Sequence, residues 1–263
     1  MSPSSDSSVS SAPSALPRTP SLPSLQGQVA LITGGSRGLG AAIAQVLGES
    51  GMHLVLADLN LERAQDCAAM LGELDIQAVA MALDVSDPQQ CQAVVQASVE
   101  RFGRLDALIN NAAIDVTTAL ADLAVEDWLR VLHTNLSGPL LMTKFALAHM
   151  RGQPGGGHVV NIASTASKRA WPNASAYHAT KWGLLGLSHA LHAELRDQRV
   201  RVSAIVAGGM KTPFLLDRFP GIDESRLQNP LNVACAVRYV LQQPEGTVVP
   251  ELTVLPTLES SWP

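Results

Sequence analysis

From Gln28 onward, short apolar runs alternate with longer segments in which apolar residues recur at helical spacing. This alternation predicts βαβ units around a parallel sheet. The predicted strands are Val29–Thr33, His53–Ala57, Gln77–Met81, Leu105–Ile109, His158–Ile162, Val200–Ile205 and Thr253–Leu255. Because these runs are continuously apolar and do not alternate with polar positions, helices are expected on both faces of the sheet. The pattern therefore predicts an α/β fold with a doubly wound, mostly parallel, seven-stranded Rossmann-like sheet.

Six segments between the runs are predicted to be helices: 38–50, 60–72, 86–102, 125–150, 176–198 and 230–242. Ser86, followed by Asp87 and Pro88, is a typical N-cap for the third of these helices. A chain of 263 residues can fold as one sizeable α/β domain, and we place that domain at residues 25–263.

Residues 1–24 are mostly Ser, Pro and Ala, with charged side chains at Asp6 and Arg18 alone. Such a segment cannot bury enough apolar surface to offset the entropy lost on ordering, so a disordered tail is expected. It does not have the charged start and apolar run of a secretory signal, and no later segment is apolar over a length that spans a bilayer. We therefore expect a cytoplasmic protein.

The chain carries 23 acidic and 18 basic side chains, a net charge of −5, without a cluster of Lys and Arg. This balance argues against nucleic acid or an anionic membrane as a partner. Cys67, Cys91 and Cys235 lie far apart in predicted helices, and the histidines do not have the spacing of metal ligands. We expect buried thiols and no metal site.

The first predicted strand leads into the glycine-rich segment Thr33–Gly40, and a helix follows at once. Glycines there let the backbone approach a pyrophosphate, whose charge is stabilised at the helix N-terminus. Asp58 ends the second strand, where a carboxylate either accepts both ribose hydroxyls of NAD or caps the next helix. Asp84, at the end of the third strand, either meets the adenine edge or is a turn residue.

Tyr177 and Lys181 are four residues apart in a predicted helix, so their side chains should project from the same face about one turn apart. A phenol has a reference pKa of about 10, which a nearby ammonium lowers, and it could then exchange a proton with an alcohol or ketone. This spacing is also common on ordinary helix surfaces. His178, the next residue, points about 100° away from Tyr177 and is expected to pack elsewhere.

In order and spacing, the chain resembles the short-chain dehydrogenase/reductase family in Thr33-Gly34-x-x-x-Gly38-x-Gly40, Asn110-Asn111-Ala112-Ala113, Asn135, Ser164 and Tyr177-x-x-x-Lys181. The resemblance covers roughly residues 27–255. It implies an NAD(P)(H)-dependent alcohol dehydrogenase or carbonyl reductase that acts on a small alcohol or ketone. It also implies a homo-oligomer, typically a tetramer.

By this resemblance, Tyr177 is the catalytic acid/base and Ser164 hydrogen-bonds the substrate oxygen. Lys181 is expected to bind the nicotinamide ribose and lower the pKa of Tyr177, while Asn135 anchors a water of the proton relay. The implied cofactor contacts are Gly34, Ser36, Arg37, Gly38, Leu39, Gly40, Asp58, Asp84, Val85, Asn111, Ala112, Tyr177, Lys181 and Thr212.

NAD(H) is the expected cofactor, with NADP(H) less favoured. A strand-end carboxylate at Asp58 repels a 2′-phosphate, whereas Arg37 is a basic residue on an exposed loop that could attract one. We expect Asp58 to prevail, because it also loses its ribose contact when the 2′ position is phosphorylated.

The family pattern has two departures here. Ala113 stands where the family usually has Gly, which is a small change. Ala207-Gly208 stands where Pro-Gly is usual, and without the rigid Pro the course of that loop is less certain.

The resemblance places the substrate pocket along Ile114–Val116, Thr165–Trp171 and Met210–Phe219, which are mainly apolar. Trp171, Phe214 and Phe219 are expected to form walls for an alicyclic or aromatic ketone. Lys168 and Arg169 are expected to be solvated loop charges.

Two other functions are compatible with parts of the pattern. Sugar-nucleotide epimerases and dehydratases have their second glycine one position earlier and a larger C-terminal region, so Gly38 and the short C-terminus argue against them. A non-catalytic nucleotide-sensing or scaffold protein could share the fold. Such proteins commonly lose the Tyr or the Ser that this chain keeps.

Overall fold

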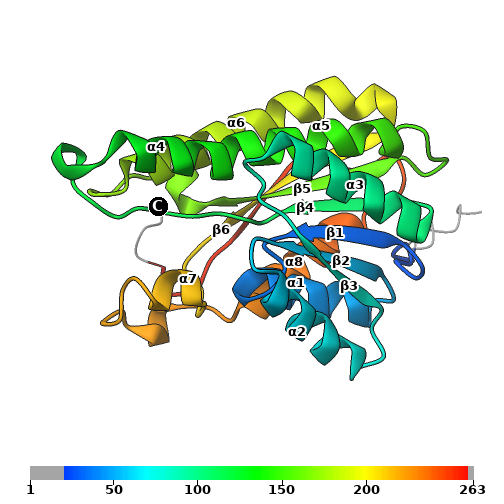
Figure 1. Ribbon diagram of the computed structural model, residues 1–263, viewed down its shortest axis with the longest axis horizontal. Helices are drawn as coiled ribbons and strands as arrows, with labels where there is room; N and C mark the ends of the chain where they lie inside the picture. Colours follow the sequence, from blue (N-terminus) through cyan, green and yellow to red (C-terminus); the bar gives the residue numbers. More distant parts are fainter. Residues whose placement is uncertain (1–20, 260–263) are drawn as a thin grey trace, which may run out of the picture.

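A seven-stranded sheet forms the centre of the computed structural model, which describes residues 21–259 (Figure 1). The strand order is β3-β2-β1-β4-β5-β6-β7, and every neighbouring pair is parallel. The strands are β1 (Val29–Thr33), β2 (His53–Asp58), β3 (Ala78–Ala82), β4 (Ala107–Asn110), β5 (Gly157–Ser164), β6 (Val200–Ala207) and β7 (Glu251–Val254). The predicted seven-stranded, doubly wound sheet is confirmed.

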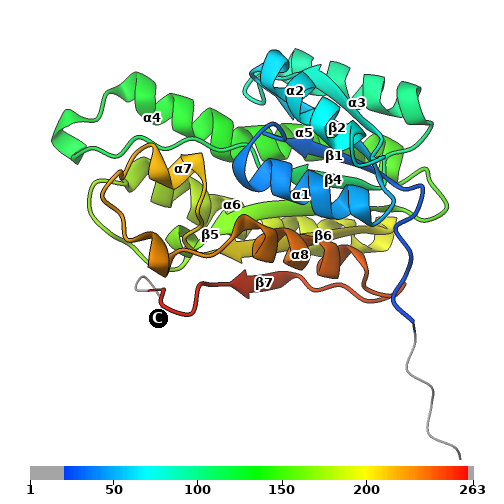
Figure 2. The same cartoon turned by 90° about the horizontal axis from the view of Figure 1, so that it is seen from below.

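Helices cover both faces of this sheet, as its continuously apolar strands require (Figures 1 and 2). The helices are α1 (Gly38–Glu49), α2 (Leu61–Gly72), α3 (Pro88–Phe102), α4 (Val125–Leu132), α5 (Gly138–Met150), α6 (Ser175–Leu195), α7 (Pro213–Leu216) and α8 (Pro230–Leu241). One face packs against α1, α2 and α8, with Ile43, Leu47 and Val237 in its core. The other packs against α3, α5 and α6 through residues such as Met142 and Leu191.

Side-chain caps fix where several helices begin. Asn60 accepts a hydrogen bond from the amide of Arg63 at 2.8 Å and begins α2. The carboxylate of Asp87 accepts bonds from the amides of Gln89 and Gln90 and begins α3. The predicted cap at Ser86 was therefore wrong by one residue, because Asp87 directly precedes the proline at the first helical position.

The predicted single helix 125–150 is interrupted. Residues His133–Ser137 form a π-helical turn in which the amide of Gly138 bonds to the carbonyl of His133, five residues earlier. The turn separates α4 from α5 and contains the buried Asn135. The four-residue helix α7 was also absent from the sequence prediction, because it is shorter than a periodic pattern can reveal.

The strand order reverses between β1 and β4: β2 and β3 extend to one side of β1, and β4 to β7 extend to the other. The loops that follow β1 and β4 consequently leave the sheet in opposite directions and open a crevice at their carboxyl ends. This crevice is where a ligand site is expected in a doubly wound sheet.

Two sequence expectations concern the termini and the cysteines. The predicted tail, residues 1–24, lies outside the described residues except for 21–24, which form neither helix nor strand. Cys67 and Cys91 are buried as expected, whereas Cys235 is exposed. Cys235 lies two residues from both Val233 and Val237, which are buried on α8. Its side chain therefore projects about 160° away from theirs, on the opposite face of the helix.

His158 is a buried polar group within the central strand β5. The hydroxyl of Ser203 donates to the carbonyl of Val249 at 2.7 Å, so Nε2 of His158 must donate to the Ser203 oxygen at 2.8 Å. Nδ1 is buried with no hydrogen-bond partner among the described residues. Burial, with a smaller contribution from Arg201, holds the pKa of His158 well below its ordinary value.

We predict that His158 makes the fold sensitive to acid. Below about pH 6.5 the unfolded chain takes up a proton at this residue and the folded chain does not. The free energy of unfolding therefore decreases as the pH is lowered, by at most about 1.4 kcal/mol per pH unit. His158→Asn should reduce the slope of unfolding free energy between pH 7 and pH 5, measured by urea titration. His192→Asn, on a partly exposed face of α6, is the matched control. An unchanged slope in His158→Asn would contradict the prediction.

Candidate active site

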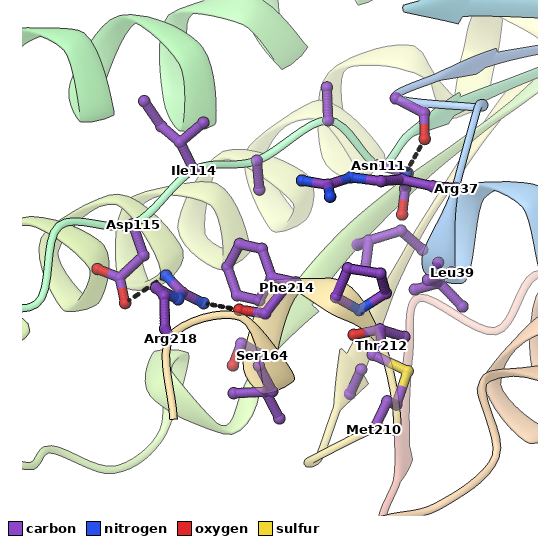
Figure 3. Close-up of a pocket in the computed structure, with 18 of the residues that line it drawn as sticks. Arg37, Leu39, Asn111, Ile114, Asp115, Ser164, Met210, Thr212, Phe214 and Arg218 are labelled. Atoms are coloured by element: carbon purple, nitrogen blue, oxygen red, sulfur yellow. Dashed lines mark hydrogen bonds and ion pairs between the residues drawn. The ribbon is translucent and has the colours of Figure 1, made fainter. Parts of the chain in front are cut away.

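A cavity of about 1340 Å³ opens at the carboxyl ends of the strands. It brings together the loops after β1 to β6 and one end of α6, segments that are far apart in the sequence. Figure 3 shows residues of the loops after β1, β4, β5 and β6 around the cavity. The predicted site residues that line it are Gly34, Arg37, Gly38, Leu39, Asp58, Asp84, Val85, Asn111, Ala112, Ser164, Tyr177, Lys181 and Thr212. Three further predicted residues, Ser36, Gly40 and Asn135, are not part of the lining.

Space requires glycine at two positions of the loop after β1. Gly34 has a φ of +62°, and a Cβ there would lie 3.0 Å from the Cα of Ala112. A Cβ on Gly40 would lie 2.0 Å from the carbonyl oxygen of Gly34, so Gly40 lets α1 approach the loop. The N-terminal end of α1 at Gly38 therefore faces the cavity, where its amides favour a phosphate.

Asn111 joins the loop after β4 to the glycine-rich loop. Its side chain donates to the carbonyl oxygens of Thr33 and Gly34 at 2.9 and 3.0 Å. The hydroxyl of Thr33 accepts in return from the amides of Asn111 and Ala112 at 3.0 and 3.1 Å. Asn111 lines the cavity, but its amide nitrogen is committed to shaping the loops.

Asp58 lies at the end of β2 and lines the cavity. Its carboxylate accepts from the amides of Ser36 and Asn60 at 3.2 and 3.0 Å, so it is tied to the glycine-rich loop. The helix cap is Asn60, which removes the alternative role of Asp58 as N-cap of α2. The hydroxyl of Ser36 is buried and has no hydrogen-bond partner among residues 21–259.

Arg37, next to this carboxylate in the cavity lining, forms an ion pair with Asp217 at 3.4 Å. Both side chains are more than half exposed. The pair is therefore weak, but it places an acidic partner beside the guanidinium that sequence reasoning had left unpartnered.

Asp84 has the hydrogen bonds of a turn residue. Its Oδ1 accepts from the amide and the hydroxyl of Ser86 at 2.8 and 2.6 Å. Asp84 and Val85 also line the cavity. The two roles left open by the sequence are thus compatible.

Ser164, Tyr177 and Lys181 meet where β5 ends and α6 begins. The oxygen of Ser164 accepts from the amide of Ala166 at 3.1 Å. Lys181 Nζ lies 5.6 Å from the centroid of the Tyr177 ring and donates to the carbonyl of Ile162 at 2.8 Å. The helix therefore presents the phenol and the ammonium to one cavity, as their spacing predicts.

Burial dominates the acid–base properties of this pair. It raises the pKa of Tyr177 to about 12, against an opposing hydrogen bond with Ser164. It lowers the pKa of Lys181 to about 8, against the opposing charge of Asp115. The expectation that Lys181 lowers the pKa of Tyr177 is not met, because desolvation outweighs the other contributions and the ammonium is directed to Ile162.

Asn135 connects three parts of the fold from the π-helical turn. Its side-chain oxygen accepts from the amide of Ile114 at 2.9 Å, and its nitrogen donates to the carbonyl of Ile114 at 2.8 Å. The same nitrogen donates to Thr180 Oγ1 at 3.2 Å, on α6 between Tyr177 and Lys181. Asn135 therefore positions the loop after β4 against the helix that carries Tyr177 and Lys181.

His178 does more than pack. Its Nε2 accepts from the amide of Trp171 at 3.1 Å, so Nδ1 carries the hydrogen and donates to the carbonyl of Ala166 at 2.9 Å. The ring also meets Trp171 edge-on, with centroids 4.3 Å apart. His178 thereby holds the segment that follows Ser164, a role that adjacency to Tyr177 did not reveal.

The loop after β6 keeps its course without the usual proline. The amide of Gly208 donates to Val254 at 2.9 Å, and the amide of Gly209 donates to the carboxylate of Glu259 at 2.9 Å. This anchoring leaves Thr212 buried in the cavity wall, close to Gly38. Backbone and carboxylate contacts thus take the place of a fixed proline φ.

The substrate side of the cavity is largely apolar, as predicted. Trp171, Phe214 and Phe219 all line it, and the Phe214 ring lies 5.8 Å from that of Tyr177. Lys168 is not the solvated charge expected from the sequence: its Nζ forms a 2.7 Å ion pair with Glu251 on β7. Sequence reasoning could not pair two residues so far apart along the chain.

Sequence reasoning also missed an ion pair on this side. Arg218 Nη1 lies 2.9 Å from the carboxylate of Asp115, and both residues line the cavity. Figure 3 shows this pair beside Phe214 and Ser164, with Arg37, Leu39 and Thr212 on the other side of the site. Both residues lie in segments that the sequence predicts to line the substrate pocket, Ile114–Val116 and Met210–Phe219, but their pairing was not predicted.

Two properties of residues 21–259 bear on other classes of function. Their helices include none with the length and hydropathy to span a membrane. Their His, Cys, Asp and Glu side chains form no group of three or more that could hold a metal ion.

Known proteins are similar to this chain in sequence and in fold. A sequence model of the short chain dehydrogenase family matches residues 28–221. The chain is 37% identical over 194 residues to trans-4-hydroxycyclohexanecarboxylate dehydrogenase of Sinomonas cyclohexanicum, which covers 71% of this chain and 74% of that protein. It is 39% identical over 181 residues to D-threitol dehydrogenase of Mycolicibacterium smegmatis, covering 69% of each.

A solved structure gives the same result. The crystal structure of a metagenomic short-chain oxidoreductase in complex with NADP matches with a TM-score of 0.79 and 32% identity, over 90% of this chain and 100% of that chain. Its NADP gives no support to a preference for NAD, so NAD(P) is the cofactor class of the family. Motifs, sheet topology and relatives agree, and the chain belongs to the short-chain dehydrogenase family of oxidoreductases.

Proposed function

We propose that this protein interconverts a secondary alcohol and a ketone with NAD(P)(H), and that Tyr177 exchanges the proton. The observation that carries the proposal is the meeting of Ser164, Tyr177 and Lys181 in the cavity that begins at the glycine-rich loop. The names of two relatives, trans-4-hydroxycyclohexanecarboxylate dehydrogenase and D-threitol dehydrogenase, both specify a hydroxyl compound as substrate. They support the alcohol/ketone class without identifying the compound.

The residues present fit a dinucleotide. Gly34 and Gly40 let the loop after β1 pack closely against Ala112 and α1, which brings the start of α1 to the cavity for a phosphate, and Asp58 places a carboxylate at the end of β2 for the ribose hydroxyls. Thr212 is the contact proposed for the carboxamide of the nicotinamide, and Lys181 for its ribose. When bound, the nicotinamide accepts or supplies the hydride.

The chain itself moves the proton. Tyr177 Oη takes the proton of the alcohol in oxidation and returns it to the carbonyl oxygen in reduction, while Ser164 orients that oxygen. Because burial raises the pKa of Tyr177 to about 12, the protonated phenol dominates near neutrality. That form is ready to donate, which favours ketone reduction at neutral pH. Asn135, whose side-chain nitrogen donates to Thr180 Oγ1, is proposed to continue the proton relay.

We also propose a preference for NAD(H) over NADP(H). Asp58 would repel a 2′-phosphate, and the residue best placed to attract one, Arg37, is paired with Asp217. An ordinary hydrogen-bonding role for Asp58, to Ser36 and Asn60, is compatible with this because a carboxylate has further lone pairs.

A homo-oligomer is proposed as well. Leu140 on α5 and Trp182 on α6 are large apolar side chains with 45% and 53% of their surface exposed. Such residues are typical of subunit contacts. Sedimentation equilibrium should show an assembly that Trp182→Glu weakens; a monomeric wild-type protein would contradict the proposal.

The first test of the reaction uses the two tyrosines of the chain. Tyr177→Phe should lower kcat by about 100-fold or more, the usual scale for a positioned acid/base, and leave NADH binding and folding nearly intact. Tyr239→Phe, on the exposed face of α8, is the matched control and should turn over normally. Turnover is followed by nicotinamide absorbance with a set of ketones and NADH. Near-normal turnover in Tyr177→Phe would remove Tyr177 from the mechanism.

The second test concerns the cofactor. We expect kcat/KM to be about tenfold or more higher with NADH than with NADPH, and Asp58→Ala to narrow this ratio. In the Asp58→Ala background, Asp217→Ala should lower the NADH/NADPH ratio of kcat/KM further, because removal of the Asp217 carboxylate frees Arg37 for a 2′-phosphate. Asp66→Ala, an exposed acid on α2, controls for the loss of charge. Equal use of both cofactors by the wild type would refute the assignment of Asp58.

A further inference from the structure

Asp115 and Arg218 form an ion pair at the substrate side of the cavity. Asp115 follows β4, and Arg218 follows α7, so the pair joins the two segments that border the cavity next to Ser164 (Figure 3). The side chain of Asp115 is 7% exposed and that of Arg218 is 23% exposed. This is a largely desolvated pair, in contrast to the exposed Arg37–Asp217 pair at the cofactor side.

The guanidinium of Arg218 is held on three sides. Nη1 lies 2.9 Å from Asp115 Oδ2, and Nη2 donates to the carbonyl of Phe214 at 2.5 Å. The central carbon lies 3.9 Å above the centroid of the Phe214 ring. These contacts engage both terminal nitrogens, whereas the buried Nε has no hydrogen-bond partner among the described residues, and the Asp115 carboxylate balances the charge. Arg218 therefore faces the site with its charge already neutralised.

The neighbouring charges do not favour an anionic substrate either. The lining near the pair includes Asp223, Glu259 and Arg226, of which two are acidic. Glu259 accepts the amide of Gly209, and Asp223 accepts the amide and hydroxyl of Ser225. Of the other cations in the lining, Lys181 belongs to the proposed catalytic group, Arg130 pairs with Asp127 at 2.6 Å, and Arg226 is exposed to solvent. A substrate carboxylate buried beside Phe214 would thus lose its hydration, and the guanidinium next to it, that of Arg218, is already paired with Asp115.

The other walls are apolar and flat. Phe214, Phe219 and Trp171 line this side, and Leu258 joins them from the C-terminal segment. Aromatic and aliphatic walls of this kind bury a hydrocarbon ring well.

We propose that the Asp115–Arg218 ion pair determines substrate specificity by restricting the site to uncharged, ring-sized secondary alcohols and ketones. The inference rests on the proposed alcohol/ketone oxidoreductase function and adds the substrate class to it. Asp115 is the residue that decides the charge: without its carboxylate, Arg218 presents a positive charge to the same cavity.

The test compares two ketones of the same shape, 4-oxocyclohexanecarboxylate and its carboxamide. The wild-type enzyme should reduce the neutral carboxamide with a kcat/KM at least tenfold above that of the carboxylate. Asp115→Asn keeps the size of the side chain and should raise the carboxylate/carboxamide ratio of kcat/KM by about tenfold or more. Arg218→Gln should lower that ratio, because it leaves the Asp115 carboxylate unpaired.

Asp197→Asn is the matched control, an exposed acid remote from the cavity whose substitution removes the same charge and should leave the ratio unchanged. Thermal unfolding of each variant separates loss of fold from loss of selectivity. A merely structural ion pair would alter both substrates alike and leave the ratio constant in Asp115→Asn, which would overturn the inference.

The remaining outcomes also decide. A wild-type preference for the carboxylate, or turnover of open-chain ketones with neither ring substrate accepted, would overturn the substrate class while leaving the reaction type intact. Absence of turnover with every carbonyl compound tried would instead refute the proposed function itself.

Discussion

The hydrogen bonds between Thr33 and Asn111 link the two loops that leave the sheet in opposite directions. The hydroxyl of Thr33 accepts two amides of the loop after β4, and the Asn111 side chain donates to two carbonyls of the loop after β1. Without them the crevice between these loops would have no fixed width. The position of the α1 N-terminus relative to the catalytic helix depends on this link, because the two lie on opposite sides of the crevice.

Burial shifts the pKa values of the two ionisable groups of the site, Tyr177 and Lys181, in opposite directions. The same dry environment stabilises a neutral phenol at Tyr177 and a neutral amine at Lys181, so it raises the pKa of the phenol to about 12 and lowers that of the ammonium to about 8. Near neutral pH the phenol is therefore protonated and can donate its proton. Asp115 opposes ionisation of the phenol and favours that of the amine, and Arg218 favours ionisation of the phenol. The substrate-side ion pair and the acid–base pair are therefore electrostatically coupled.

Much of this architecture could be predicted from the sequence, because buried parallel strands are continuously apolar and the site residues follow their carboxyl ends. The spacing of Tyr177 and Lys181 was sufficient to predict that they lie together, since residues four apart in a helix project from the same face. The pairing of Asp115 with Arg218, and of Lys168 with Glu251, could not be predicted. Each joins segments far apart along the chain, and neither position carries a local pattern that depends on the partner. The π-helical turn was hidden for the same reason, because Asn135 finds its partners at Ile114 and Thr180.

That turn has a consequence for how the long helical segment meets the sheet. A single five-residue hydrogen bond adds one residue to the helix, which rotates everything beyond it by about 100°. The face of α5 that carries Met142 and Ala146 is buried in the core, whereas α4, before the turn, contributes Arg130 to the lining of the cavity. The turn thus changes which face each helix presents: α5, after the turn, contributes to the core, and α4, before it, contributes to the rim of the site.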